Sequence, residues 1–376
     1  MQPYPTDQNN QIPPAHAPEH YPNHRFIPSG APVQGFPTYS PQQYTFVPGI
    51  GFVRRSPEDE ERAQLRTAGT RLAAAMLFCL ALMYLVYPVA SLLSSRIVVL
   101  FHGSVSTAAS GLLSTTITYL AAVLIPFGVY QARVGIPIRA AFSLRRPRAW
   151  LVVCGTLIFL AATVVASFSS DVLDAVLGSA GLYARQTSVA MPADPFGIVL
   201  YVLLYVVLSS VVEEFVFRGL VLQSLRRFGD GLALVCSSML FALIHTDLLI
   251  LPYAFLSGLV LGYFVLRSGS LVTGIVIHSV NNLFWVVYDV ASKRLDPAWS
   301  GIVPEGISIV FILCGIVALV VAARRDKNLF TLAPANAVLP FKARLQTLMG
   351  SGAMILLYIA ASVIMATSIS TTYIPW

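Results

Sequence analysis

The sequence has very little charge. Only 11% of its 376 residues are Asp, Glu, Lys or Arg, whereas soluble domains carry about 25%. The net charge of +7 does not indicate nucleic-acid binding, because the Lys and Arg residues lie between apolar runs, where they anchor and orient membrane helices. We therefore expect an integral membrane protein in contact with the lipid bilayer and without a nucleic-acid partner.

Cysteine is also scarce. The four cysteines lie in apolar runs, and none has the spacing of a metal-ligand pair: Cys79, Cys154, Cys236 and Cys314. Buried free thiols are the expected state of such residues, so we predict neither a disulfide framework nor a cysteine metal site.

The N-terminal region lacks the apolar core of a signal peptide. Residues 1 to about 53 are rich in Pro, Gln, Tyr, Asn and His. A segment of this composition cannot bury enough apolar surface to offset the entropy lost on ordering. We predict a disordered, cytoplasmic, Pro- and Gln-rich tail over residues 1–66 and a transmembrane domain over residues 67–376.

Long apolar runs are what the sequence has in abundance: 56% of the residues are hydrophobic, and the mean hydropathy is +0.73. A helix needs about 20 mostly apolar residues to cross a hydrocarbon core of about 30 Å. We predict an all-α, polytopic transmembrane helical bundle of about eight to nine spans. The nine candidates are 72–94, 110–131, 150–170, 196–220, 231–248, 250–267, 270–288, 302–323 and 348–370.

The fifth and sixth runs are short and are joined only by residues Asp247 to Pro252. Thirty-eight residues from Asp230 to Arg267 must make both crossings. We expect this hairpin to stop short of the outer face, or to project into the cytoplasm at its inner end. Gly258 and Gly262 have the spacing that favours close packing of the sixth run against another helix.

Basic residues indicate the orientation. They cluster before the first run and in the loops after the second, fourth, sixth and eighth runs. Loops rich in Lys and Arg stay on the cytoplasmic side. We therefore predict a multi-pass protein of the plasma membrane with a cytoplasmic N-terminus.

Ionisable side chains are rare inside the runs. Of 17 acidic residues, only Glu213 and Glu214 lie well within a run, and only His245 and His278 do so among the six histidines. Arg218 is the one Arg embedded in an apolar stretch. Because ionisable groups are costly at membrane depth, they are candidates for function.

The spacing of these residues predicts how they face. Glu214 and Arg218 are four residues apart, so they can pair on one helical face. Glu213 points about 100° away from Glu214 on an α-helix and is free to face another group. His278 and Asn282 are also four apart and can project to one point.

Three of the runs can bring their polar residues to similar heights. If Gly229 is the apex of a helical hairpin, Glu214 lies 15 residues before it and His245 lies 16 after it. Each is then about 22–24 Å from the apex, at about 1.5 Å per residue. His278, eleven residues beyond Arg267, is about 16 Å along its own run by the same measure. We predict that these side chains converge.

Several chemistries remain open for such a cluster. A Glu beside a His in a wet cavity can activate water, and a second His with an Asn can donate hydrogen bonds to an oxyanion. If zinc is used, its ligands are Glu213, His245 and His278. The residues alone are equally compatible with a non-catalytic polar network or with a transporter that relays protons.

The motifs around these residues resemble a known family. Glu-Glu-x-x-x-Arg at 213–218, Phe-x-x-x-His at 241–245 and His-x-x-x-Asn at 278–282 occur in that order, each in a predicted span. This arrangement resembles the CAAX protease and bacteriocin-processing (CPBP) family of intramembrane endopeptidases, to which the CAAX prenyl-protein endopeptidase belongs. The resemblance covers about residues 195–290; the Pro-rich head and the ninth span are not features of the family core.

The resemblance implies a role for each motif residue. Glu213 would be the base that activates water, helped by His245. The Glu214–Arg218 pair would support it, and His278 with Asn282 would form the oxyanion site. The cofactor is either none or zinc.

The resemblance also implies a substrate and leaves alternatives. It implies hydrolysis of a peptide bond in a membrane-associated protein, CAAX-type or otherwise lipidated. A non-enzymatic immunity or scaffold protein of the same fold is the second reading, and a proton-relay transporter, for which the sequence shows no internal repeat, is the third. The sequence does not indicate the oligomeric state.

Overall fold

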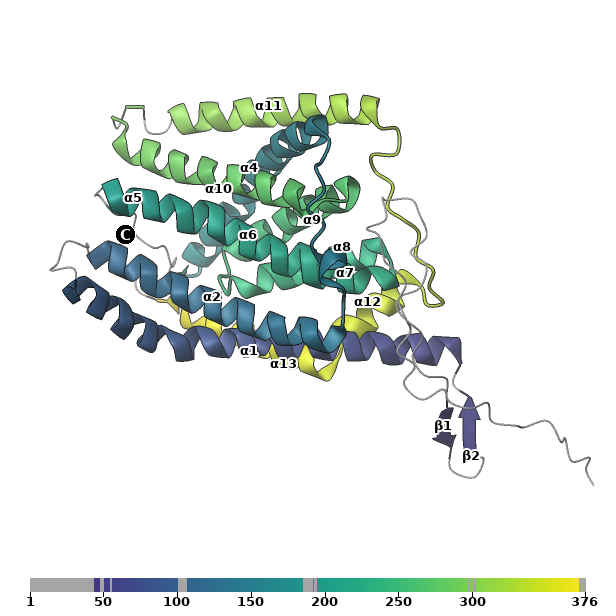
Figure 1. Ribbon diagram of the computed structural model, residues 1–376. Coiled ribbons are helices and arrows are strands. Elements are labelled where there is room, and N and C mark those ends of the chain that lie inside the picture. The colour runs from purple at the N-terminus through teal and green to yellow at the C-terminus, as the bar shows by residue number, and fades with distance from the viewer. Residues whose placement is uncertain are drawn as a thin grey trace, which may run out of the picture.

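The computed structural model describes residues 44–47, 51–54, 56–100, 107–184, 192, 195–296, 298–299 and 302–371. It confirms the predicted all-α bundle: long helices lie side by side across the molecule (Figure 1). Most of the predicted N-terminal tail lies outside the described residues.

The first described elements lie within the segment assigned to the tail. Strands β1 (Tyr44–Val47) and β2 (Gly51–Arg54) pair antiparallel, and helix α1 begins at Pro57. Ser56 caps α1, since its hydroxyl accepts a hydrogen bond from the Asp59 amide at 3.1 Å and donates one to the Asp59 carboxylate at 2.8 Å. This cap, followed by Pro and an acidic first turn, is a strong start signal, and α1 thus begins within the segment 1–66 that was assigned to the tail.

Seven helices are long and apolar enough to cross a membrane among the described residues. One of them is continuous from α5 to a final 3-10 turn but contains two π-helical segments, η1 and η2. The helices that make up these spans are α1 (Pro57–Leu100), α2 (Thr107–Val134), α4 (Ala149–Ser179), α5 (Pro195–Tyr201), η1 (Val202–Leu208), α6 (Ser209–Glu213), η2 (Glu214–Val221), α7 (Leu222–Leu225), η3 (Arg226–Phe228), α9 (Ile250–Ser268), α10 (Leu271–Arg294) and α11 (Ile302–Arg325).

Shorter elements complete the bundle. Helices α12 (Phe341–Met349) and α13 (Gly352–Thr367) are bent by 66° at the break between them and count as an eighth span if the pair is one. The four-residue α3 (Ile138–Ala141) follows α2. Strands β3 (Tyr183–Ala184) and β4 (Ile369–Ser370) pair antiparallel and join the chain after α4 to the chain after α13.

The count of nine candidate spans is wrong at the fifth. Helix α8 (Asp230–Ile244) has only 15 residues, or about 22 Å at about 1.5 Å per residue, against a hydrocarbon core of about 30 Å. It ends where Thr246 takes a left-handed φ of 48°. The described bundle therefore has seven or eight spans, and the short α8 agrees with the expectation that the hairpin 230–267 does not make two full crossings.

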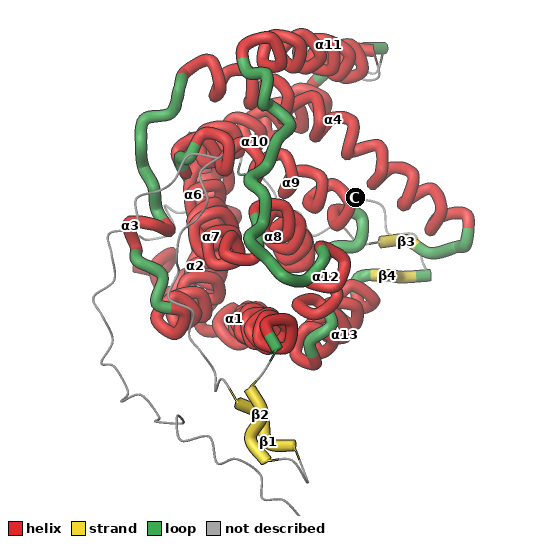
Figure 2. Tube along the Cα trace, turned by 90° about the vertical axis from the view of Figure 1, so that its right-hand side faces the viewer, coloured by secondary structure: helices red, strands yellow, loops and turns green. Residues whose placement is uncertain are grey.

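The arrangement of the helices places α8 inside the bundle. Helix α11 lies along one edge and α1 with α13 along the opposite edge (Figure 1), and α8 is enclosed when the bundle is seen end-on (Figure 2). Most residues of α8 are buried. His245 follows α8 directly and therefore lies in the interior of the bundle.

Small residues let α9 approach α8 closely. A Cβ on Gly258 would lie 2.9 Å from the Ser238 Cα, and one on Gly262 would lie 2.6 Å from the Leu234 Cδ1. Both distances are shorter than a methyl group can tolerate. The predicted packing role of this glycine pair is confirmed.

Candidate active site

The two adjacent glutamates lie at a junction in one long helix. Glu213 is the last residue of α6, and Glu214 is the first residue of the π-helical segment η2. Such π-helical segments are frequent at functional sites. The sequence pattern gave no sign of the π-helical turns, because the apolar residues around them fit an ordinary α-helix equally well.

Glu214 and Arg218 form a buried ion pair, as their spacing predicts. The Arg218 Nη1 donates to the Glu214 Oε1 at 2.8 Å, and the two side chains are 1% and 0% exposed. The guanidinium also donates to the Gly258 carbonyl at 3.4 Å and lies 4.3 Å from the centre of the Phe241 ring. Stacking of a guanidinium on an aromatic face is favourable, which gives a structural reason for the Phe of the second motif.

Helix α10 packs against the Glu214 carboxylate at a glycine. A Cβ on Gly274 would lie 2.4 Å from the Glu214 Oε2 and 2.7 Å from the Val265 Cγ2. Gly274 is therefore one of the residues that allow α10 to lie beside η2. The close approach brings His278, one turn further along α10, to the same carboxylate.

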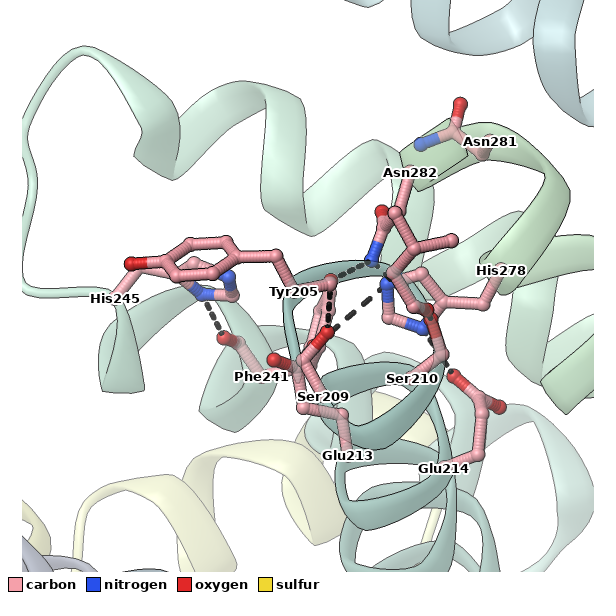
Figure 3. A network of polar contacts seen from close by, with 12 residues as sticks. Tyr205, Ser209, Ser210, Glu213, Glu214, Phe241, His245, His278, Asn281 and Asn282 are labelled. Atoms are coloured by element: carbon pink, nitrogen blue, oxygen red, sulfur yellow. Dashed lines mark hydrogen bonds and ion pairs between the residues drawn. The ribbon is translucent and has the colours of Figure 1, made fainter. Parts of the chain in front are cut away.

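His278 faces both glutamates. Its Nδ1 lies 3.1 Å from the Glu214 Oε1, and its Nε2 lies 3.7 Å from the Glu213 Oε2. The imidazole therefore lies between the two carboxylates, with Nδ1 directed toward Glu214 and Nε2 toward Glu213. Figure 3 shows this imidazole projecting from its helix toward the helix that carries the two glutamates.

Glu213 has a partner that the sequence did not reveal. The Tyr119 hydroxyl of α2 donates to the Glu213 Oε1 at 3.0 Å, across a separation of 94 residues. A tyrosine in an apolar run carries no signal of its own, because such residues are usually part of a core. Only the packing of α2 beside η2 brings it to the site.

His245 is held in one orientation by the backbone. Its Nδ1–H donates to the Phe241 carbonyl at 2.8 Å (Figure 3). In the neutral ring this leaves Nε2 as the acceptor. The left-handed Thr246 that follows ends the helix here and sets the direction in which the chain leaves.

Asn282 lies beside the long helix that carries Glu213, and its side-chain amide already donates hydrogen bonds to that helix. Its Nδ2 donates to the Tyr205 carbonyl at 3.3 Å and to the Ser210 hydroxyl at 3.2 Å. The neighbouring Asn281 accepts from Thr163 at 2.8 Å. The bond to the Tyr205 carbonyl is longer than the usual N–H···O distance of about 2.7–3.2 Å, so an anionic oxygen in the cavity could replace it.

One cavity brings the predicted residues together. It has a volume of about 430 Å³, and its lining includes Glu213, His245, His278, Asn282 and Tyr119. The remaining lining is mostly apolar and aromatic, from η1, α9 and α10. Glu214 and Arg218 are buried behind this wall. The arrangement places a carboxylate and two imidazoles beside an apolar space large enough for part of a ligand.

Comparison with protein families identifies this part of the chain. Residues 195–284 match the family described as type II CAAX prenyl endopeptidase Rce1-like. These residues form an Rce1-like CAAX endopeptidase domain. The family is one of membrane proteases. Neither a curated protein nor a solved structure matches the chain.

The Rce1-like domain covers about a quarter of the chain, 90 of 376 residues counted from 195 to 284. It begins with α5 and ends within α10. All six residues predicted from the motifs lie inside it. Tyr119 lies outside it, on a helix that the family resemblance does not cover.

The zinc set considered for the Rce1-like domain does not fit the geometry. Within the described ranges, no group of three or more His, Cys, Asp or Glu side chains is placed to hold a metal ion. Both ring nitrogens of His278 face carboxylates, and one nitrogen of His245 is bonded to the backbone. A metalloprotease with zinc bound by Glu213, His245 and His278 is therefore not supported.

Proposed function

We propose that the protein is an intramembrane endopeptidase that hydrolyses a peptide bond with a water molecule activated by Glu213, helped by His245. One observation carries the proposal: the Glu213 carboxylate lines the cavity, whereas its neighbour Glu214 is occupied by Arg218. A carboxylate with this freedom is available to accept a proton, as a general base requires.

The hydrolytic step can be written with these residues. Glu213 takes a proton from water as the water oxygen bonds to the scissile carbonyl carbon. The carbonyl oxygen becomes an oxyanion, to which His278 and Asn282 donate hydrogen bonds. The carbon–nitrogen bond then breaks, and the proton held by Glu213 passes to the leaving amine.

Glu214 and Arg218 support this step without touching the substrate. The pair fixes His278, because the Glu214 Oε1 accepts from Arg218 and faces the His278 Nδ1 at 3.1 Å. Positioned donors act without reorganising during the reaction. His245, with Nε2 left as its acceptor, is in the same cavity and can share the water with Glu213.

We propose that the substrate is a membrane-associated protein of CAAX type or otherwise lipidated. Two observations support this. The cavity lining is largely apolar, and the matching family is described as a CAAX prenyl endopeptidase family. An apolar wall favours an apolar chain or apolar peptide side chains next to the scissile bond.

We also propose a plasma-membrane location with a cytoplasmic N-terminus. Arg267 at the end of α9 pairs with Asp326 after α11, and Arg344 of α12 donates to the Phe228 carbonyl before α8. These contacts gather the basic loops at one end of the bundle, which is the arrangement expected of a cytoplasmic side. Labelling of single cysteines placed in these loops, in intact and in permeabilised cells, tests the orientation.

The function is tested with purified wild-type and Glu213→Ala proteins in detergent. Both are incubated with quenched membrane peptides, including a prenylated CAAX peptide, with and without a zinc chelator. We expect cleavage by the wild type and a loss of about 10²–10⁴-fold in the variant, the usual contribution of a general base. Equal cleavage by two well-folded proteins would contradict the role of Glu213.

The same experiment separates the alternatives. Cleavage that survives the chelator supports a water step without metal, and cleavage that is lost supports a metal. An immunity or scaffold protein would cleave none of the peptides, and Glu213→Ala would leave its binding function intact.

A further inference from the structure

Helix α2, which lies outside the Rce1-like domain, reaches into the site. Its Tyr119 hydroxyl donates to the Glu213 Oε1 at 3.0 Å and lines the same cavity. We propose that Tyr119 is a positioning residue that holds the Glu213 carboxylate in the orientation needed to activate water. This inference rests on the proposed function.

Glu213 needs such a partner, since its other close contact is weaker. The His278 Nε2 lies 3.7 Å from the Glu213 Oε2, which is beyond the usual N–H···O distance of about 2.7–3.2 Å. The bond from Tyr119 is within that range. A hydrogen bond to a carboxylate is roughly twice as strong as one between neutral groups, so Tyr119 fixes one oxygen and leaves Oε2 toward the imidazole.

The position of Tyr119 is itself fixed by packing between α2 and the domain. The Phe127 ring of α2 meets the Phe217 ring of η2 edge-on with centroids 6.0 Å apart. The Tyr130 hydroxyl of α2 is 2.7 Å from the Ser224 hydroxyl of α7. These two contacts fix how α2 is aligned along the helix that carries Glu213, and this alignment places Tyr119 beside Glu213.

Tyr130 also provides a matched control. Tyr119→Phe and Tyr130→Phe each remove one hydroxyl from α2 and one hydrogen bond to the same long helix, Gly197–Phe228. Tyr130 does not line the cavity. A merely structural role for Tyr119 would therefore make the two variants behave alike.

The activity test uses kcat and KM measured on any quenched peptide that the wild type cleaves. We expect Tyr119→Phe to lower kcat by roughly 10-fold or more, because a hydrogen bond to a charged group is stronger than one between neutral groups. KM should change little, since the bond is made to the base and not to the substrate. Tyr130→Phe should keep the wild-type kcat, and Tyr119→Phe should lower the residual rate of Glu213→Gln no further.

Failure of this inference and failure of the proposed function look different. If Glu213→Gln remains active, the proposed function is wrong. If Glu213→Gln is inactive while Tyr119→Phe keeps the wild-type kcat, the proposed function stands and the role of Tyr119 is overturned.

A second measurement needs no substrate. The apparent melting temperatures of the wild type, Tyr119→Phe, Glu213→Gln and the double variant form a thermodynamic cycle. We expect the two substitutions to be coupled, with the double variant less affected than the sum of the single variants. Additive shifts would mean that the Tyr119–Glu213 bond contributes nothing, and the inference would fall.

Discussion

Two adjacent carboxylates on one helix have opposite surroundings. The Glu214 side chain is 0% exposed and is paired with Arg218 at 2.8 Å, whereas the Glu213 side chain is 15% exposed and lines the cavity. His278 lies between them and faces both. The comparison teaches that a rotation of about 100° around the helix can separate two identical residues into a buried, ion-paired member and a cavity-lining member.

Glu214, the buried member, has a close neighbour at each of its carboxylate oxygens. Arg218 accounts for one carboxylate oxygen, and Gly274 lies against the other. Arg218 in turn lies on the Phe241 ring. The first and second motifs thus form one buried cluster of Glu214, Arg218 and Phe241. His278 of the third motif contacts this cluster through Glu214 and also lines the cavity.

The largest expected change in stability follows removal of Arg218. Arg218→Ala leaves Glu214 buried without a counter-charge, which costs about 3–5 kcal/mol when one partner of a buried pair is lost. Glu213→Gln should cost far less, because that carboxylate faces the cavity. Apparent melting temperatures in detergent, together with the yield of monodisperse protein, measure the difference.

A double variant separates the pair from the rest of the fold. Arg218→Met with Glu214→Gln removes both charges, and we expect it to recover a large part of the stability lost in Arg218→Ala. If the double variant is as unstable as Arg218→Ala, the contacts of Arg218 with Gly258 and Phe241 matter more than the ion pair. Equal destabilisation by Arg218→Ala and Glu213→Gln would contradict the contrast itself.

A smaller effect is expected from a methyl group placed against Glu214. The added carbon of Gly274→Ala would lie 2.4 Å from the Glu214 Oε2. Either the carboxylate or α10 must move, which costs about 1–3 kcal/mol for overpacking. Because His278 is on α10, the displacement should also lower kcat, and both thermal stability and cleavage are to be measured.

The chain offers a matched glycine for this test. Gly128, in the last third of the membrane helix α2, has no atom within 4 Å of a Cβ placed on it. Gly128→Ala should leave both stability and cleavage unchanged or slightly improved, since Ala favours a helix over Gly by about 1 kcal/mol. If Gly274→Ala behaves in the same way, the close packing of α10 on Glu214 is not a constraint.

The sequence was sufficient for the part of the site that is local. Helical spacing alone predicted the Glu214–Arg218 pair, which the structure shows, and counting from Gly229 predicted that Glu214 and His245 lie near one another in height. The roles of Glu213 as the base and of His278 in the oxyanion site stay predictions. Scarcity of charge in apolar runs, together with the three motifs, was the informative signal.

Features that depend on tertiary packing could not be predicted from the sequence. Tyr119 is contributed by a helix 94 residues away from Glu213, and nothing distinguishes it from other tyrosines in apolar runs. The length of α8 depends on where the chain turns after His245, which hydropathy does not report. The start of α1 at Pro57 was missed because its first turns are charged, although the cap at Ser56 was visible in the sequence.

The smallest expected effect concerns the ion pair between Arg267, near the end of the span α9, and Asp326, which follows the span α11. Arg267 donates from Nε to the Asp326 Oδ2 at 2.9 Å, and the side chains are 14% and 22% exposed, against 1% and 0% for Arg218 and Glu214. The hydrogen bond from Arg267 lowers the pKa of Asp326 below its ordinary value of 3.8. A pair of this exposure should contribute only about 0–1 kcal/mol.

The sign of the pH dependence follows from that lowered pKa. The ionised Asp326 stabilises the fold at pH values above 3.8, and this contribution is lost as the pH falls through the lower pKa of the folded protein. Asp326→Asn should therefore lower the melting temperature slightly at neutral pH and leave it unchanged in strong acid. Lys327→Gln, at the exposed next residue, also changes the net charge by one unit, in the opposite sense, without touching the pair. A pH-independent shift in Asp326→Asn, or an equal shift in Lys327→Gln, would show that the outer pair, unlike the buried one, does not stabilise the bundle.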